Sequence, residues 1–354
     1  LTPESEIRMG DYYGLRPWIL KYTPRSGKVC EAGCGLGRYN FYLSRLGIDI
    51  VGLDFEKKTI DYLNKWKLKN GFEETSFIEG DVTNLPFKNN SLSGYISLGV
   101  VEHFVEGPQK PIKEAFRILR PGGISIITTP APSWSKFYFK LKSNVKNVIK
   151  KLLFKKISAK QFFQYEYNLW QLKKHVQKQG FYISRYAGAD LLYTFTELGH
   201  NTDRYIKQES SGYKISHLLE NSWLSFLGAQ SIVIAIKADD LMHCFFCGMK
   251  TAKLDSLKKY DVPACDHCET SSNITFYKKG NKVSFHEKYL ITPPLKPIEK
   301  KVCDLCKIDY LTDSIFEDFG FDKNICPACL GKKNINIQLS NTSIQPIWRS
   351  RLLK

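Results

Sequence analysis

Short apolar runs alternate with amphipathic segments through the first half of the chain. The pattern predicts strands at 28–32, 48–54, 75–79, 93–98 and 124–129, and helices at 37–46, 57–70 and 109–119. Such alternation predicts an α/β fold in which a parallel sheet carries helices on both faces. The break Pro121-Gly122-Gly123 ends the last of these helices.

A glycine loop follows the first predicted strand. It contains Gly33, Gly35 and Gly37, directly after the acidic residue Glu31, and it leads into a helix. Glycine lets the backbone turn tightly and lets a ligand approach it closely, while the free N–H groups of a helix start act as donors. The dinucleotide fingerprint Gly-x-Gly-x-x-Gly requires glycine where this chain has Arg38, which disfavours a pyrophosphate ligand.

A second acidic residue, Asp54, ends the next apolar run about 20 residues beyond the loop. A carboxylate there can accept hydrogen bonds from both hydroxyls of a ribose. The carboxyl ends of parallel strands share one edge of a sheet, so Glu31, Asp54, Asp81 and Gly99 are expected to lie together. The expected ligand is therefore a nucleoside without a pyrophosphate.

These residues, with Gly80-Asp81-Val82 and the run 115–123, resemble the motifs of class I S-adenosylmethionine-dependent methyltransferases. The resemblance covers roughly Tyr12 to Lys237. It implies a Rossmann-like seven-stranded sheet, with a last strand at 229–237 that runs antiparallel to the others. It also implies S-adenosylmethionine as cofactor, and the residues expected to bind it are Glu31, Gly33, Cys34, Gly35, Gly37, Asp54, Phe55, Asp81, Val82, Leu98 and Gly99.

The segment Leu98 to Phe104 bears on the acceptor of the methyl group. Methyltransferases that act on the amino groups of bases usually carry an Asn/Asp-Pro-Pro-aromatic motif here, and this chain has Glu102-His103 instead. The difference argues against base N-methylation and resembles the small-molecule branch. His103 is the candidate catalytic base, with a structural role as the alternative.

Three further segments belong to the same domain. Residues 1–27 predict a helical lead-in that either covers the cofactor or packs its aromatic side chains on the sheet. Residues 134–178 form a basic insertion with twelve lysines and one acidic residue. Its stretch 136–156 predicts a basic amphipathic helix, suited to an anionic membrane surface or to covering its own core. Residues 188–228 are the expected substrate cover.

The chain carries ten cysteines, eight of them in four Cys-x-x-Cys pairs. The spacing within each half of this set fits zinc sites, which indicates a reducing compartment and a cytoplasmic protein. No apolar run reaches the roughly 18 residues that a spanning helix needs. Two structural zinc ions are expected, one held by Cys244, Cys247, Cys265 and Cys268 and one by Cys303, Cys306, Cys326 and Cys329.

If each zinc ion is held by two consecutive Cys-x-x-Cys pairs, both loops have the length usual for zinc ribbons. An interleaved arrangement of the four pairs is the alternative. Four pairs at these spacings make redox catalysis a poor alternative. Residues 238–354 thus predict a small zinc-binding domain after a cofactor domain at 1–237. Its folding is expected to depend on metal, with the cofactor domain standing independently.

Charge separates the two domains. The formal charge of +17 divides into +13 for residues 1–237 and +4 for residues 238–354, and two tetrathiolate zinc sites bring the latter near zero. A neutral module is poorly suited to phosphates, so nucleic acid is the less favoured partner and docking of a protein partner is an alternative.

The sequence favours O-methylation of a saccharide, a lipid-linked saccharide or another small metabolite. The alternative is an RNA or protein methyltransferase that holds its substrate with the zinc module. A third hypothesis, a binding protein without turnover, is opposed by the intact glycine loop and Asp54.

Overall fold

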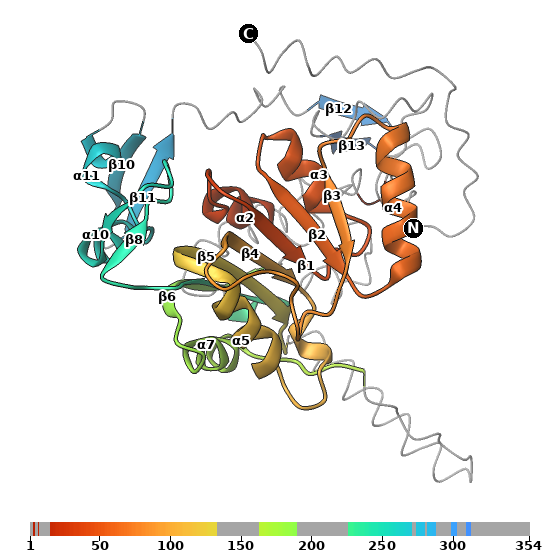
Figure 1. Ribbon diagram of the computed structural model, residues 1–354, viewed down its shortest axis with the longest axis horizontal. Helices are drawn as coiled ribbons and strands as arrows, with labels where there is room; N and C mark the ends of the chain where they lie inside the picture. Colours follow the sequence, from red (N-terminus) through yellow and green to blue (C-terminus); the bar gives the residue numbers. More distant parts are fainter. Residues whose placement is uncertain are drawn as a thin grey trace.

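A computed structural model of the chain describes residues 15–132, 163–189 and 226–270, together with Pro3, Glu6 and the backbone of four strands between residues 274 and 312. Seven strands of this part form one sheet, in the order β3-β2-β1-β4-β5-β7-β6 (Figure 1). They are β1 (Val29–Ala32), β2 (Ile50–Asp54), β3 (Ser76–Glu79), β4 (Leu92–Leu98), β5 (Leu119–Pro130), β6 (Tyr182–Ala189) and β7 (Gln230–Ile236).

The strands β1 to β5 pair parallel, and β7 pairs antiparallel with both β5 and β6. The predicted Rossmann-like α/β sheet, with its antiparallel last strand, is therefore confirmed. Because β7 alone is reversed, the carboxyl ends of β1, β2, β3 and β4 all reach one edge of the sheet, and the residues that follow them meet there.

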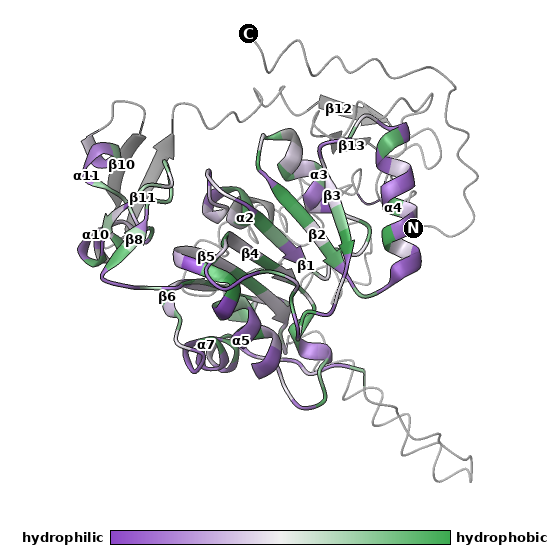
Figure 2. Cartoon of the chain, in the orientation of Figure 1, coloured by the Kyte–Doolittle hydropathy of each residue, from purple (hydrophilic) through white to green (hydrophobic). Residues whose placement is uncertain are grey.

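Helices cover both faces of the sheet. On one face lie α2 (Arg16–Tyr22), α3 (Arg38–Arg45) and α4 (Lys57–Lys69), and on the other lie α5 (Gln109–Ile118) and α7 (Leu169–Gln177). Successive side chains of a strand point to opposite faces of the sheet and so contribute to both cores. Val29 packs in the core under α2, α3 and α4, and its neighbour Cys30 packs in the core under α5 and α7. Figure 2 shows hydrophobic residues along β2 and hydrophilic residues on the visible sides of α4, α5 and α7.

The start of β5 differs from the sequence prediction. The strand begins at Leu119, five residues before the predicted 124, and includes the glycines expected to separate helix from strand. Leu119 pairs with Leu92, and Gly122 donates its N–H to the carbonyl oxygen of Lys237 at 2.8 Å. Strand pairing thus extends through the break, while the left-handed φ of +83° at Gly122 absorbs the bend.

The N-terminal lead-in contains the helix α2, with Pro17 in its first turn. Leu15, Ile19 and Tyr22 are buried in the core of the first face. Packing of this segment on the sheet is therefore observed, while Tyr12 and Tyr13 lie outside the described residues.

The insertion and the cover are described only at their ends. The basic helix expected at 136–156 lies outside the described residues, as do residues 190–225 of the expected cover. The strand β6 runs through Ala189, so the cover as predicted from 188 begins within a strand. Among the helices that the structure describes, none is long and apolar enough to cross a membrane.

A small unit follows β7. It consists of β8 (Leu241–His243), β9 (Lys250–Lys253), α10 (Leu254–Tyr260) and α11 (Asp266–Thr270). Two antiparallel hairpins come next, β10 (Ile274–Lys279) with β11 (Lys282–Glu287), and β12 (Glu299–Val302) with β13 (Asp309–Thr312).

Candidate functional site

The glycine loop joins β1 to α3 at the carboxyl edge of the sheet. Gly33 and Cys34 donate their N–H groups to the carbonyl oxygen of Leu53, at 2.7 and 3.0 Å, which ties the loop to the end of β2. Gly33, Gly35 and Gly37 all have φ between +51° and +76°, the left-handed region that side chains disfavour. The loop conformation therefore requires glycine.

The surroundings of the three glycines differ. A Cβ on Gly33 would lie 2.4 Å from Cγ2 of Val100, and one on Gly37 would lie 2.8 Å from the Phe77 ring. A Cβ on Gly35 would meet nothing within 4 Å. At Gly33 and Gly37 the absence of a side chain lets the loop pack closely against Val100 and Phe77. At Gly35 the backbone is open to solvent.

Asp54 is held directly against this loop. Its Oδ2 accepts the N–H of Gly35 at 2.9 Å, and its Oδ1 accepts the N–H of Glu56 at 3.1 Å. A carboxylate has about four lone-pair positions, so two stay available to a ligand. The side chain that could accept ribose hydroxyls and the glycine that opens to solvent are therefore neighbours.

The other predicted residues lie around the same edge. Cys34 and Val82 are buried, Leu98 and Gly99 are half-buried, and Asp81 is exposed and accepts the N–H of Thr83 at 2.8 Å. Phe55 is 80% exposed directly beyond Asp54. An exposed aromatic ring beside a carboxylate that could accept ribose hydroxyls is suited to stacking on a base.

Glu31 is buried beneath the loop. With the amide of Asn40 oriented to satisfy both of its groups, Asn40 donates to Oε2 of Glu31 at 2.6 Å and accepts the N–H of Gly52 at 2.9 Å. Burial raises the pKa of Glu31 from 4.5 to about 8, against the opposing effect of the Arg38 guanidinium. Asn40 is not among the residues predicted from the sequence, although its amide lies between the buried aromatic residues Tyr39 and Phe41 of α3.

The stability of the ligand-free protein is expected to fall with rising pH because of Glu31. The folded state holds a proton on this carboxyl up to about pH 8, whereas the unfolded chain releases it near 4.5. Glu31 therefore contributes stability that is fully present below pH 4.5, and this contribution is lost as the pH rises through about 8. Urea unfolding across this range should show the loss, and Glu31→Gln should flatten it.

Glu79→Gln is the matched control, because Glu79 is an exposed carboxylate at the end of β3 in the same sheet, 3.7 Å from Lys57. It should leave the pH profile unchanged. A profile that is the same in Glu31→Gln and in the unsubstituted protein would contradict the assignment.

Arg38 begins α3 where a dinucleotide fingerprint has glycine. Its Nε donates to Oε2 of Glu6 at 3.0 Å, and its Nη2 donates to the same oxygen. The N-terminal segment thus reaches the end of the glycine loop, in agreement with the expected lead-in. Sequence reasoning could not find this pair, because the two residues are 32 positions apart.

His103 lies in the 3-10 turn η1 (Val101–His103) after β4, and it is exposed. Its Nδ1 is 2.9 Å from the carbonyl oxygen of Phe163, whose ring contacts the imidazole edge-on at 5.2 Å between centroids. A carbonyl oxygen only accepts, so Nδ1 carries the proton and Nε2 of the neutral ring has the free lone pair. The backbone of Phe163 therefore fixes the orientation of the imidazole ring and makes Nε2 its acceptor nitrogen.

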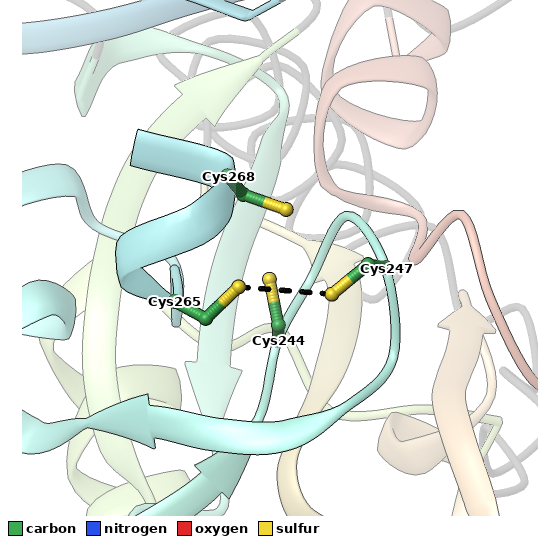
Figure 3. A group of neighbouring side chains, drawn as sticks. All are labelled: Cys244, Cys247, Cys265 and Cys268. Atoms are coloured by element: carbon green, nitrogen blue, oxygen red, sulfur yellow. Dashed lines mark hydrogen bonds between the residues drawn. The ribbon is translucent and has the colours of Figure 1, made fainter. Parts of the chain in front are cut away.

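The first cysteine set comes together after β7. The Sγ atoms of Cys244, Cys247, Cys265 and Cys268 all lie within 4.8 Å of one another, and those of Cys247 and Cys265 are 3.7 Å apart (Figure 3). A tetrahedral zinc with bonds of about 2.3 Å places its sulfur ligands about 3.8 Å apart. The donor set and its spacing therefore fit zinc.

The second cysteine set, Cys303, Cys306, Cys326 and Cys329, lies outside the described residues. The flanking strands β12 and β13 pair so that Val302 faces Asp309.

Comparison with known proteins supports the cofactor loop. Residues 30–127 match a family model described as a methyltransferase domain. A probable S-adenosylmethionine-dependent methyltransferase of Mycolicibacterium smegmatis is 28% identical over 102 residues, which are 29% of this chain and 37% of that protein. The 2-methyl-6-phytyl-1,4-hydroquinone methyltransferase 2 of Oryza sativa subsp. japonica is 32% identical over 111 residues, 30% of each chain.

Among solved structures, a methyltransferase of Methanosarcina mazei aligns with a TM-score of 0.44 and 16% identity, covering 63% of this chain and 97% of that one. The chain spans about a third of the length of the two curated relatives. For residues 30–127, the strand order, the glycine loop and the matching family model all indicate the same kind of domain. Residues 30–127 of this chain form a methyltransferase domain of the class I, S-adenosylmethionine-dependent kind.

Proposed function

We propose that the whole protein is a methyltransferase that transfers a methyl group from S-adenosylmethionine to a hydroxyl of a small molecule. The observation that carries the proposal is the contact of Asp54 with Gly35, which joins a ribose-binding carboxylate to open glycine backbone. In this proposal the loop holds the methionine part, Asp54 the ribose, and Phe55, Asp81 and Val82 border the adenine.

S-adenosylmethionine supplies a methyl group on a sulfonium centre, and the protein supplies position and a proton acceptor. Transfer is an in-line displacement, so holding the acceptor oxygen in line provides much of the catalysis. His103 is three residues after Val100, whose side chain packs against Gly33, so the histidine lies on the segment next to the glycine loop. Its Nε2 takes the proton of the acceptor hydroxyl as the new bond forms, while Nδ1 stays bonded to Phe163.

Two features support a small acceptor. The chain lacks the Asn/Asp-Pro-Pro-aromatic motif of base N-methylation after β4. The rice relative is named as a methyltransferase of a phytyl-substituted hydroquinone, which is a small molecule and not a nucleic acid or a protein. Saccharides and lipid-linked saccharides are the other acceptors of this class that we consider.

A panel of hydroxyl and amine acceptors tests this function through the release of S-adenosylhomocysteine. Hydroxyl acceptors should be methylated, and His103→Gln should slow the transfer roughly 100- to 10,000-fold without changing S-adenosylmethionine affinity. His175→Gln is the control, because this second histidine contacts Gln109 away from the glycine loop. Preference for amines, or full activity in His103→Gln, would contradict the proposed chemistry.

We also propose that Cys244, Cys247, Cys265 and Cys268 hold a structural zinc ion, and that the second cysteine set holds another. With four protein ligands the first site is closed, which is typical of structural zinc. Elemental analysis of the purified full chain should give two zinc ions per molecule.

A further inference from the structure

The loop between Cys244 and Gly248, here called the first knuckle, packs against the turn between α2 and β1. The N–H of Arg25 donates to the carbonyl oxygen of Phe245 at 3.4 Å, and the Arg25 guanidinium lies 5.5 Å from the centre of the Phe245 ring. A Cβ on Gly248 would be 2.3 Å from Oγ of Ser26. The knuckle backbone is thus in close contact with the residues that lead into β1.

A second contact joins β8 to the start of β5. His243 Nδ1 lies 3.0 Å from the carbonyl oxygen of Pro121, to which it donates, and a Cβ on Gly122 would be 2.5 Å from the carbonyl oxygen of His243. Arg120 donates from Nη2 to the carbonyl oxygen of Ser26 at 3.0 Å. The beginnings of β1 and β5 therefore meet the cysteine unit at one place.

A third contact comes from the end of α10. Asp261 forms an ion pair with Arg185 of β6, and Ser184 donates its hydroxyl to the carbonyl oxygen of Asp261 at 2.5 Å. Apolar side chains fill the space between these polar contacts. Met242, Phe245, Leu257 and Val262 are buried in the same cluster as Ile19 of α2.

All three contacts are at the amino edge of the sheet. The strands β1, β5 and β6 begin there, and their carboxyl ends lie at the opposite edge, where the glycine loop is. Figure 1 shows β8 on the side of β5, with α10 next to β8. The first knuckle thus faces the cofactor domain, and its Phe245 is occupied by internal packing.

We propose that the first cysteine unit is an internal brace of the cofactor domain, so that its metal stabilises the amino edge of the sheet instead of presenting a substrate-binding knuckle. The inference rests on the proposed zinc site. In this proposal residues 242–268 fold together with the cofactor domain, in place of the two independently folding parts expected from the sequence. Coupling runs through β1, which begins three residues after Ser26 and ends at the glycine loop.

Hydrogen exchange of the full chain, with zinc and after chelation, tests the brace. Peptides covering 23–32 and 119–125 should exchange about tenfold faster or more once the metal is removed. If the purified chain binds no zinc at the first site, the zinc proposal itself fails. If zinc binds but these peptides exchange equally fast with and without it, only the brace is overturned.

Gly248→Ala separates docking from metal binding, because the new methyl group would collide with Ser26. Gly47→Ala is its matched control: Gly47 has φ +78° against +77° for Gly248, and its Cβ would meet nothing within 4 Å. Both variants should keep zinc, but only Gly248→Ala should lose the effect of chelation on 23–32 and 119–125. Arg185→Gln, which removes the ion pair with Asp261, should weaken that effect as well, and an undiminished effect in both interface variants would overturn the brace.

Discussion

Asp54→Ala is expected to weaken binding of S-adenosylmethionine by roughly 10- to 150-fold. The carboxylate bonds the N–H groups of Gly35 and Glu56 and, in our account, accepts the ribose hydroxyls. Its removal deletes charge-assisted hydrogen bonds worth about 1.5 to 3 kcal/mol. Isothermal titration calorimetry measures the change.

Two variants make this result specific. Asp54→Asn keeps an oxygen for one of the two N–H groups and should show a smaller loss of affinity. Asp49→Ala removes an exposed carboxylate five residues earlier, which lies 3.8 Å from Lys28, and should leave the affinity unchanged. If Asp54→Ala binds as tightly as the unsubstituted protein, the ribose is bound elsewhere.

Gly33→Ala and Gly35→Ala are expected to fail in different ways. Both positions have a left-handed φ, so an alanine costs about 1 to 2 kcal/mol of strain at each. At Gly33 the methyl group also overlaps Val100, which adds roughly 1 to 3 kcal/mol of overpacking. Gly33→Ala should therefore lose the most stability in urea unfolding.

Gly35→Ala should lose little stability beyond the backbone strain. Its methyl group would project into the open space that we assign to the cofactor, so S-adenosylmethionine binding should be lost. Gly71→Ala is the control, because Gly71 has φ +71° and open space around its Cβ, away from the loop. Normal cofactor affinity in Gly35→Ala would show that the ligand does not approach this glycine.

The alternation of strands and helices, and the edge of the sheet that carries the candidate site, could be predicted because both depend on local patterns. An apolar run, a glycine loop and an acidic residue after each strand place Gly33, Asp54 and Asp81 without long-range information. Strand pairing depends on residues that are distant in sequence. The strand β5 begins before Gly122, at Leu119, because Leu119 pairs with Leu92 of β4.

The contacts that refine the site join residues far apart in sequence. Asn40 reaches Glu31 because α3 packs over β1 and β2, and Phe163 reaches His103 across 60 positions. The grouping of Cys244, Cys247, Cys265 and Cys268 was predictable from their spacing, and it agrees with the sequential pairing of the Cys-x-x-Cys motifs. Their position at the amino edge was not, because it depends on how Phe245 and Met242 pack against α2.

The central claim is that the glycine loop binds S-adenosylmethionine and not a dinucleotide. Calorimetric titration of the full chain with S-adenosylmethionine, and separately with NAD, tests it most directly. The account predicts one bound S-adenosylmethionine per chain and no measurable NAD binding, because Arg38 and its Glu6 partner occupy the place of the last fingerprint glycine. Tighter binding of NAD than of S-adenosylmethionine would contradict it.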